Sequence, residues 1–174
     1  MQTGILSNLS DSATAALAGE AFRFPAQRDL YALWCDKRGA RKMPPWSSFD
    51  PVALRRWLGN LNLLDVIEGG KDFRYRVHGT TIASKVGADM TGKLVSQWHE
   101  PFRSEAFHTY GKVVAAAAPF LVRDCESLGD YYFLHYRLVL PLSDNGESVD
   151  RLLTLLTLTD TRTQAAPVEM IKLP

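Results

Sequence analysis

The chain has 174 residues, of which 46% are hydrophobic and 22% are charged. This composition is typical of one folded domain with its own core, and it excludes a disordered or fibrous chain. Twenty basic and 19 acidic side chains give a formal net charge of +1, so no overall field attracts nucleic acid or an anionic membrane. We therefore expect neither of these as a partner.

The first residues indicate a leader outside the folded domain. Residues 1–20 are rich in Ser, Ala, Thr and Gly and contain few large apolar side chains. They lack the basic start and apolar run of a signal peptide, and no apolar run in the chain approaches the ~18 residues of a membrane span. We predict a flexible leader over residues 1–20, one domain over residues 21–160, a tail over residues 161–174 and a cytoplasmic location.

The first predicted helix covers residues 27–38. Apolar side chains recur there at helical spacing, and Gly39 is a natural stop. The apolar face carries Leu30, Leu33 and Trp34. We expect this face to cover a sheet or to form a homodimer contact.

A short helix and a hairpin follow. Asp50 is a favourable N-cap residue, and Pro51 fits the first helical position because it needs no N–H there. Residues 61–67 and 73–78 flank the turn-forming residues 68–72, which predicts two antiparallel strands.

The stretch FRYRVHGTTIASKVGADMTGK, residues 73–93, raises the question of a phosphate-binding loop. A dinucleotide-binding loop has three glycines within about six residues, between a strand and a helix. Gly79, Gly87 and Gly92 are spaced much more widely. We interpret them as joints between a strand and successive short helices.

A longer helix is predicted from Pro101 onward, and Pro119 ends it. Its apolar arc includes Phe102, Ala106 and Tyr110, and the opposite side is polar. The polar side carries Ser104, Glu105, His108 and Lys112.

Three strands complete the domain, over residues 120–125, 131–142 and 152–159. Their connections are too short for parallel crossovers, so the strands are antiparallel. The sequence predicts an α+β domain with a five-stranded antiparallel sheet.

This order of elements resembles the PAS domain, and the resemblance covers about Leu30 to Thr159. It is similar in particular to the small, often stand-alone PAS-like proteins of alphaproteobacteria. The stretches that carry the resemblance are LYALWCDKRGARKMP, SSFDPVALRRWLGNLNLLDV, FRYRVHGTTIASKVGADMTGK and YYFLHYRLVLPLSDNG. The resemblance implies helices on one face of the sheet, an N-terminal helix capping the other face, and a sensory role without catalysis.

The resemblance does not identify a cofactor, and we leave it unknown. A flavin photoadduct of the LOV type needs a cysteine shortly after Gly92, and residues 92–98 contain none. Non-covalent flavin binding stays open. A haem ligand on the long helix would have to be His108, which falls on the polar side. The four histidines show no metal-site spacing.

Aromatic residues predict a pocket between the sheet and the helices. Apolar walls with a few hydroxyl and indole donors are typical of small-molecule sites. Arg123 shares a strand face with Leu121, and an inward Arg123 would favour an acidic ligand. A filled core with tyrosine hydroxyls at its edge is the alternative. The candidate pocket residues are Tyr75, Trp98, Tyr110, Arg123, Tyr132 and Tyr136.

Three functions are open at this point. We expect a module that binds a small ligand and signals through contacts with a protein partner. The alternative is a ligand-free dimerisation module. The third is a small hydrolase with His99, Glu100 and Tyr110 at its mouth, although Glu100 also suits the positive end of the long helix.

A basic cluster lies at the end of the first helix and in the loop beyond. It suits the negative end of that helix and a solvated surface, and we do not interpret it as a nucleic-acid site. Its members are Lys37, Arg38, Arg41 and Lys42.

Overall fold

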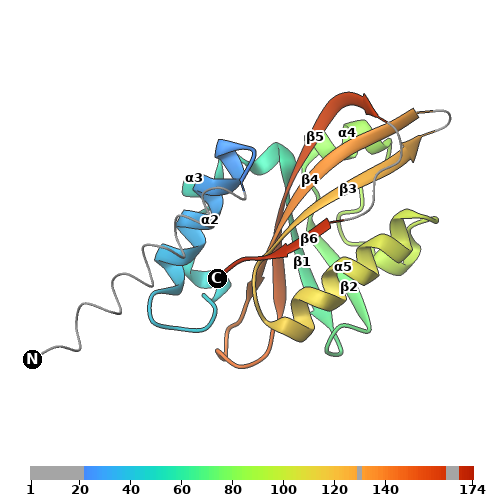
Figure 1. The fold of residues 1–174 in the computed structure, drawn as a ribbon. Coiled ribbons are helices and arrows are strands. Elements are labelled where there is room, and N and C mark those ends of the chain that lie inside the picture. Colours follow the sequence, from blue (N-terminus) through green and yellow to red (C-terminus); the bar gives the residue numbers. More distant parts are fainter. Residues whose placement is uncertain (1–21, 129–130, 164–168) are drawn as a thin grey trace, which may run out of the picture.

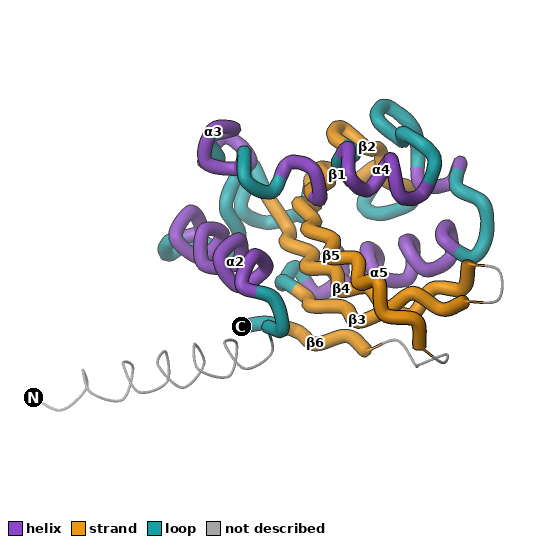
Figure 2. Tube along the Cα trace, turned by 90° about the horizontal axis from the view of Figure 1, so that it is seen from above, coloured by secondary structure: helices purple, strands orange, loops and turns teal. Residues whose placement is uncertain are grey.

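The computed structural model describes residues 22–128, 131–163 and 169–174. It contains one six-stranded antiparallel sheet, in the order β2-β1-β5-β4-β3-β6. Helix α2 lies on one face of the sheet, and α4 and α5 lie on the other (Figures 1 and 2). The helices are α2 (Pro25–Arg38), α3 (Pro51–Leu54), α4 (Thr80–Val86) and α5 (Phe102–Ala116). The strands are β1 (Leu61–Ile67), β2 (Asp72–Val77), β3 (Phe120–Leu128), β4 (Tyr131–Leu142), β5 (Arg151–Thr163) and β6 (Glu169–Lys172).

The predicted α+β class and the antiparallel sheet are confirmed, but the predicted number of strands is wrong. Residues 161–163 extend β5, and the four residues of β6 pair with β3 from Phe120↔Lys172 to Arg123↔Glu169. A strand this short shows too little alternation to be recognised in a sequence. The predicted leader, residues 1–20, lies outside the described residues.

Helix α2 covers the outer face of the sheet. This was the first of the two expectations for its apolar face. Leu30 and Trp34 are completely buried there. The Trp34 indole N–H donates to the Pro141 carbonyl at 2.9 Å, and the Gln27 amide donates to the Tyr136 carbonyl at 3.0 Å. Because Leu30 and Trp34 are buried within their own chain, the expected homodimer contact through them is wrong. Only half-buried Leu33 remains accessible on this face.

The glycines after β2 act as joints, as the sequence predicted. Gly79 is the N-cap residue of α4, and a Cβ there would lie 2.4 Å from the Gly59 carbonyl oxygen. Gly87 ends α4 with a φ of 73°, a left-handed conformation that favours glycine. The chain can thus leave β2, form α4 and turn back beside the sheet.

No helix in the described ranges combines the length and the apolar character that crossing a bilayer requires.

Candidate functional site

Strand β4 presents alternate side chains to two covered faces of the sheet. Tyr136 faces α2, where its hydroxyl accepts a hydrogen bond from Arg23 at 3.0 Å. His135 and Arg137 point the opposite way, because successive side chains of a strand alternate. Both line a cavity on the side of α4 and α5. His135 and Arg137 therefore lie inside the molecule.

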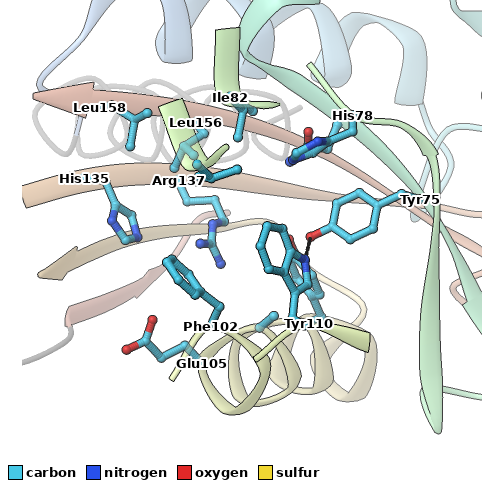
Figure 3. A pocket seen from close by; sticks show the side chains of 14 residues that line it. Tyr75, His78, Ile82, Phe102, Glu105, Tyr110, His135, Arg137, Leu156 and Leu158 are labelled. Carbon is cyan, nitrogen blue, oxygen red and sulfur yellow. Dashed lines mark hydrogen bonds between the residues drawn. The ribbon is translucent and has the colours of Figure 1, made fainter. Parts of the chain in front are cut away.

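The cavity between the sheet and these helices has a volume of about 50 Å³. Figure 3 shows Arg137 reaching from β4 toward the helix that carries Phe102 and Glu105, with His135 beside it. Ile82 of α4 and Leu156 of β5 supply aliphatic walls. Residues from both layers thus converge on one small space.

Aromatic side chains form the wall nearest β2 and α5. Tyr75, Trp98, Phe102 and Tyr110 line this part of the cavity. The Trp98 indole N–H donates to the Tyr75 hydroxyl at 3.3 Å, as Figure 3 marks. Burial raises the pKa of Tyr75, so its hydroxyl stays protonated at physiological pH. The wall is therefore apolar, with neutral hydrogen-bonding groups at its surface.

The polar groups opposite this wall include a permanent charge. Arg137 has its guanidinium carbon 5.7 Å from the centre of the Tyr110 ring, a cation–π contact. Next to it, burial and then the Arg137 charge lower the pKa of His135 to about 3, so this imidazole is neutral. Its Nε2 lies 3.7 Å from an Asp124 carboxylate oxygen, and both side chains are 2% exposed.

Glu105 is the group in the cavity that titrates near neutral pH. Burial raises its pKa to about 7, the nearby Asp124 charge adds to this effect, and Arg137 opposes it. Glu105 can therefore donate a hydrogen bond when protonated and accept one when ionised. His78, 6% exposed, adds a second imidazole whose pKa is lowered by burial.

The structure brings together only part of the predicted pocket. Tyr75, Trp98 and Tyr110 line the same cavity. That they bind a ligand stays a prediction. Tyr132 belongs to β4, but its side chain lies outside the described residues.

Tyr136 and Arg123 were assigned to the wrong face. They are register partners on β3 and β4 and therefore share a face, the one that α2 covers. Arg123 donates to a Glu169 carboxylate oxygen at 3.3 Å, at the edge of that face. Arg137 is thus the arginine that lines the cavity.

The sequence reasoning missed His78, His135 and Glu105 as cavity residues. An arginine lies two positions from each histidine, a polar pattern that gives no sign of burial in the sequence, yet both histidines are buried. Glu105 was placed on the solvated side of the long helix, but it flanks the buried stripe that contains Ala106 and Thr109. Thr109, one turn beyond Glu105 on the same side of α5, is buried and widens this stripe, which the sequence alone does not show.

The mouth proposed for a hydrolase does not form. His99 and Glu100 are exposed, whereas Tyr110 is 2% exposed inside the cavity. Glu100 accepts a hydrogen bond from the Ser104 N–H at 3.1 Å, and its hydrogen bonds with Ser104 hold its pKa below the usual range. Glu100 therefore serves the first turn of α5.

Comparison with known proteins gives one family. A model of the PAS domain matches residues 22–157, which run from before α2 into β5 and include every cavity residue named above. No curated protein and no solved structure matches the chain. The match spans well over half of the 174 residues and agrees with the observed sheet and helices. The chain therefore belongs to the PAS domain family, a family of sensory and signalling modules that typically lack catalytic activity.

Proposed function

We propose that this PAS domain is a cytoplasmic sensor that binds a small polar molecule in the cavity and signals through protein contacts, without catalysis. The observation that carries the proposal is the convergence of a few polar groups, Arg137, Glu105 and His78 among them, on a space whose remaining walls are mostly aromatic and aliphatic. A few polar groups that converge within apolar walls are typical of small-molecule sites.

The size of the cavity limits the ligand. A buried water molecule needs about 10–15 Å³ of cavity volume, so the cavity of about 50 Å³ holds roughly three to five waters. Sites for drug-sized ligands have volumes of roughly 300 Å³ or more. A ligand with a few non-hydrogen atoms therefore fits as the structure stands. A flavin or a haem requires α4 and α5 to move away from the sheet.

The charged groups of the cavity predict that ligand binding changes the protonation of Glu105. Arg137 carries a permanent charge and can donate to an oxygen-bearing group of the ligand. Glu105 has a pKa of about 7, so it senses a new charge nearby. A bound anion would raise this pKa further and a bound cation would lower it. Ligand binding would therefore be accompanied by proton uptake or release near neutral pH.

The experiment combines native mass spectrometry of freshly purified protein with a ligand screen. The screen uses formate, acetate, methylammonium and urea as probes, read by amide chemical shifts. Ala106→Leu fills the cavity, because Ala106 lines it and is 6% exposed. Ala115→Leu makes the same change at an exposed position of α5 and is the matched control.

A co-purifying small mass, or shifts of the cavity amides that Ala106→Leu abolishes and Ala115→Leu preserves, would support the proposal. An apo mass together with unchanged cavity amides for all four probes would refute binding of a small polar ligand. The small cavity volume favours a ligand-free interaction module as the second candidate. In that case Ala106→Leu would leave the binding of protein partners unchanged.

A further inference from the structure

Helices α2 and α3 form an open groove that is separate from the cavity. The groove lies between α2 and α3, which Figure 2 shows beside each other, and its volume is about 510 Å³. Leu33, Val52 and Ala53 supply apolar lining, to which Trp57, 5% exposed, also belongs. The rim carries Asp29, Arg55 and Arg56. This space is about ten times larger than the cavity.

Contacts between α2 and the residues just after α3 hold the groove in shape. The Trp57 indole N–H donates to the Ala26 carbonyl at 3.0 Å. Arg56 lies 2.9 Å from an Asp29 carboxylate oxygen, and its guanidinium carbon is 4.1 Å from the centre of the Trp57 ring. A groove fixed by contacts of this kind loses little conformational freedom when a partner binds.

Exposed apolar side chains lie at the groove and in the segment just after it. Val52, which lines the groove, is 64% exposed, and Leu58, four residues after the end of α3 and outside the lining, is 44% exposed. They are two of the four large hydrophobic side chains that are exposed among the described residues. Apolar side chains that are grouped and rimmed by charges mark interaction sites more often than single ones do.

The segment that builds the groove is strongly basic. Residues 22–60 contain eight Lys and Arg but three Asp and no Glu, a formal charge of +5 in a chain whose total is +1. Asp29 and Asp36 form ion pairs with neighbouring basic residues, and Asp50 accepts the Val52 N–H as the N-cap of α3. Within the described parts of the chain, exposed Arg55 has no ion pair. Among the residues that line the groove, Arg56 is paired with Asp29, so Arg55 presents one uncompensated positive charge beside the apolar side chains.

We propose that the groove is the docking site for an acidic, amphipathic segment of a partner protein. Charge complementarity favours an acidic segment, and the exposed side chain of Val52 fits the apolar face of such a segment. The inference rests on the proposed signalling role, because it specifies the partner that would read the signal. None of the cavity residues lines the groove.

Two other occupants fit the groove less well. A second copy of the chain, joined by a two-fold axis through this surface, would place one basic segment against another. A nucleic acid would use aromatic side chains as stacking platforms, but Trp57 is only 5% exposed and Arg56 covers its ring. The exposed lining is aliphatic, which suits a peptide.

The test uses a fluorescein-labelled helical peptide of about 15 residues, with Glu on one face and Leu on the other. Its binding to the full chain is measured by fluorescence anisotropy. We expect a Kd between about 1 and 100 µM, weakened at least about five-fold by Arg55→Glu and by Val52→Glu. Lys112→Glu makes the same charge change as Arg55→Glu on exposed α5 and should stay within about two-fold. Circular dichroism checks the fold of each variant.

Several results would overturn the proposal. The first is a Kd above about 1 mM for the peptide. A second is an equal loss of peptide affinity with Arg55→Glu and with Lys112→Glu. A third is equal affinity for a peptide in which every Leu is replaced by Ser. Tighter binding of single-stranded DNA, or a dimer that Val52→Glu dissociates, would identify another occupant. Ala106→Leu should leave peptide binding intact, so failure of this proposal and failure of the cavity proposal are distinguishable.

Discussion

Replacing Glu105 by Gln should make the stability of this domain less dependent on pH. Gln is close in shape to the protonated glutamic acid and cannot ionise. In the folded state, burial raises the pKa of Glu105 from its ordinary value of 4.5 to about 7. The folded state therefore binds a proton more tightly than the unfolded state does between these two pH values.

The sign of the effect follows from this difference in proton binding. Stability falls with rising pH wherever the folded state binds more protons, so the contribution of Glu105 is fully present below about pH 4.5 and is lost as the pH rises through about 7. The two pKa values correspond to at most about 3 kcal/mol. Because Glu105 is only partly buried, water screens its charge, and we expect about 1–2 kcal/mol.

The assay is urea unfolding of the wild type and of Glu105→Gln from about pH 4 to about pH 9. His135 changes the wild-type profile in the opposite direction, because its pKa is lowered to about 3 and its contribution is lost as the pH falls below about 6.5. Glu105 is not a cause of that shift. The stability difference between variant and wild type therefore isolates Glu105.

We expect the free energy of unfolding of Glu105→Gln, relative to that of the wild type, to rise by about 1–2 kcal/mol from about pH 4 to about pH 9. Glu147→Gln, at an exposed loop position, is the matched control and should show no such trend. A difference that does not change with pH, or one in which the wild type gains on the variant as the pH rises, would refute the reasoning. The second result would mean that Arg137 stabilises the ionised carboxylate by more than burial disfavours it.

Three further predictions concern the framework of the site, each measured as the free energy of unfolding. Gly79→Ala should destabilise the domain by about 2–4 kcal/mol, because the added Cβ would lie 2.4 Å from a backbone oxygen. Gly111→Ala should stabilise it by about 0.5–1 kcal/mol, since nothing lies within 4 Å of a Cβ at this helical position. An equal effect of the two substitutions would contradict both predictions. Trp34→Phe should cost about 1–3 kcal/mol, because it leaves the buried Pro141 carbonyl without the indole N–H. A change below about 0.5 kcal/mol would contradict this account of the contact between α2 and β4.

Most of the elements could be predicted from local patterns. The turn residues, the N-cap residue Asp50 and the helical arc through Tyr110 each depend on near neighbours in the sequence, so the fold class and most element boundaries followed. Asp50 does accept the Val52 N–H at 2.8 Å. Strand β6 escaped prediction because its pairing with β3 is set by residues about 50 positions away.

The composition of the cavity could be predicted less well, because the two faces of β4 are both covered. Alternation shows that His135 and Arg137 share one face and that Tyr136 lies on the other, but not which face meets α4 and α5. The apolar side was assigned to the cavity, since burial is the usual fate of apolar side chains. In this molecule α2 packs against the apolar side of β4, and the polar side of β4 lines the cavity.

The arrangement of β4 also explains how the cavity and the groove could communicate. Arg137 lines the cavity, and Tyr136, its neighbour in the chain, contacts the start of α2 on the other face of the sheet. The Tyr136 carbonyl accepts a hydrogen bond from the Gln27 amide, and the Tyr136 ring lies 5.1 Å from the ring of Phe24. A ligand that shifts Arg137 therefore acts on the backbone that supports α2, and α2 carries Leu33 in the groove. If both proposals hold, the coupling must be reciprocal: the factor by which a cavity ligand changes affinity for the acidic segment is the factor by which that segment changes affinity for the ligand.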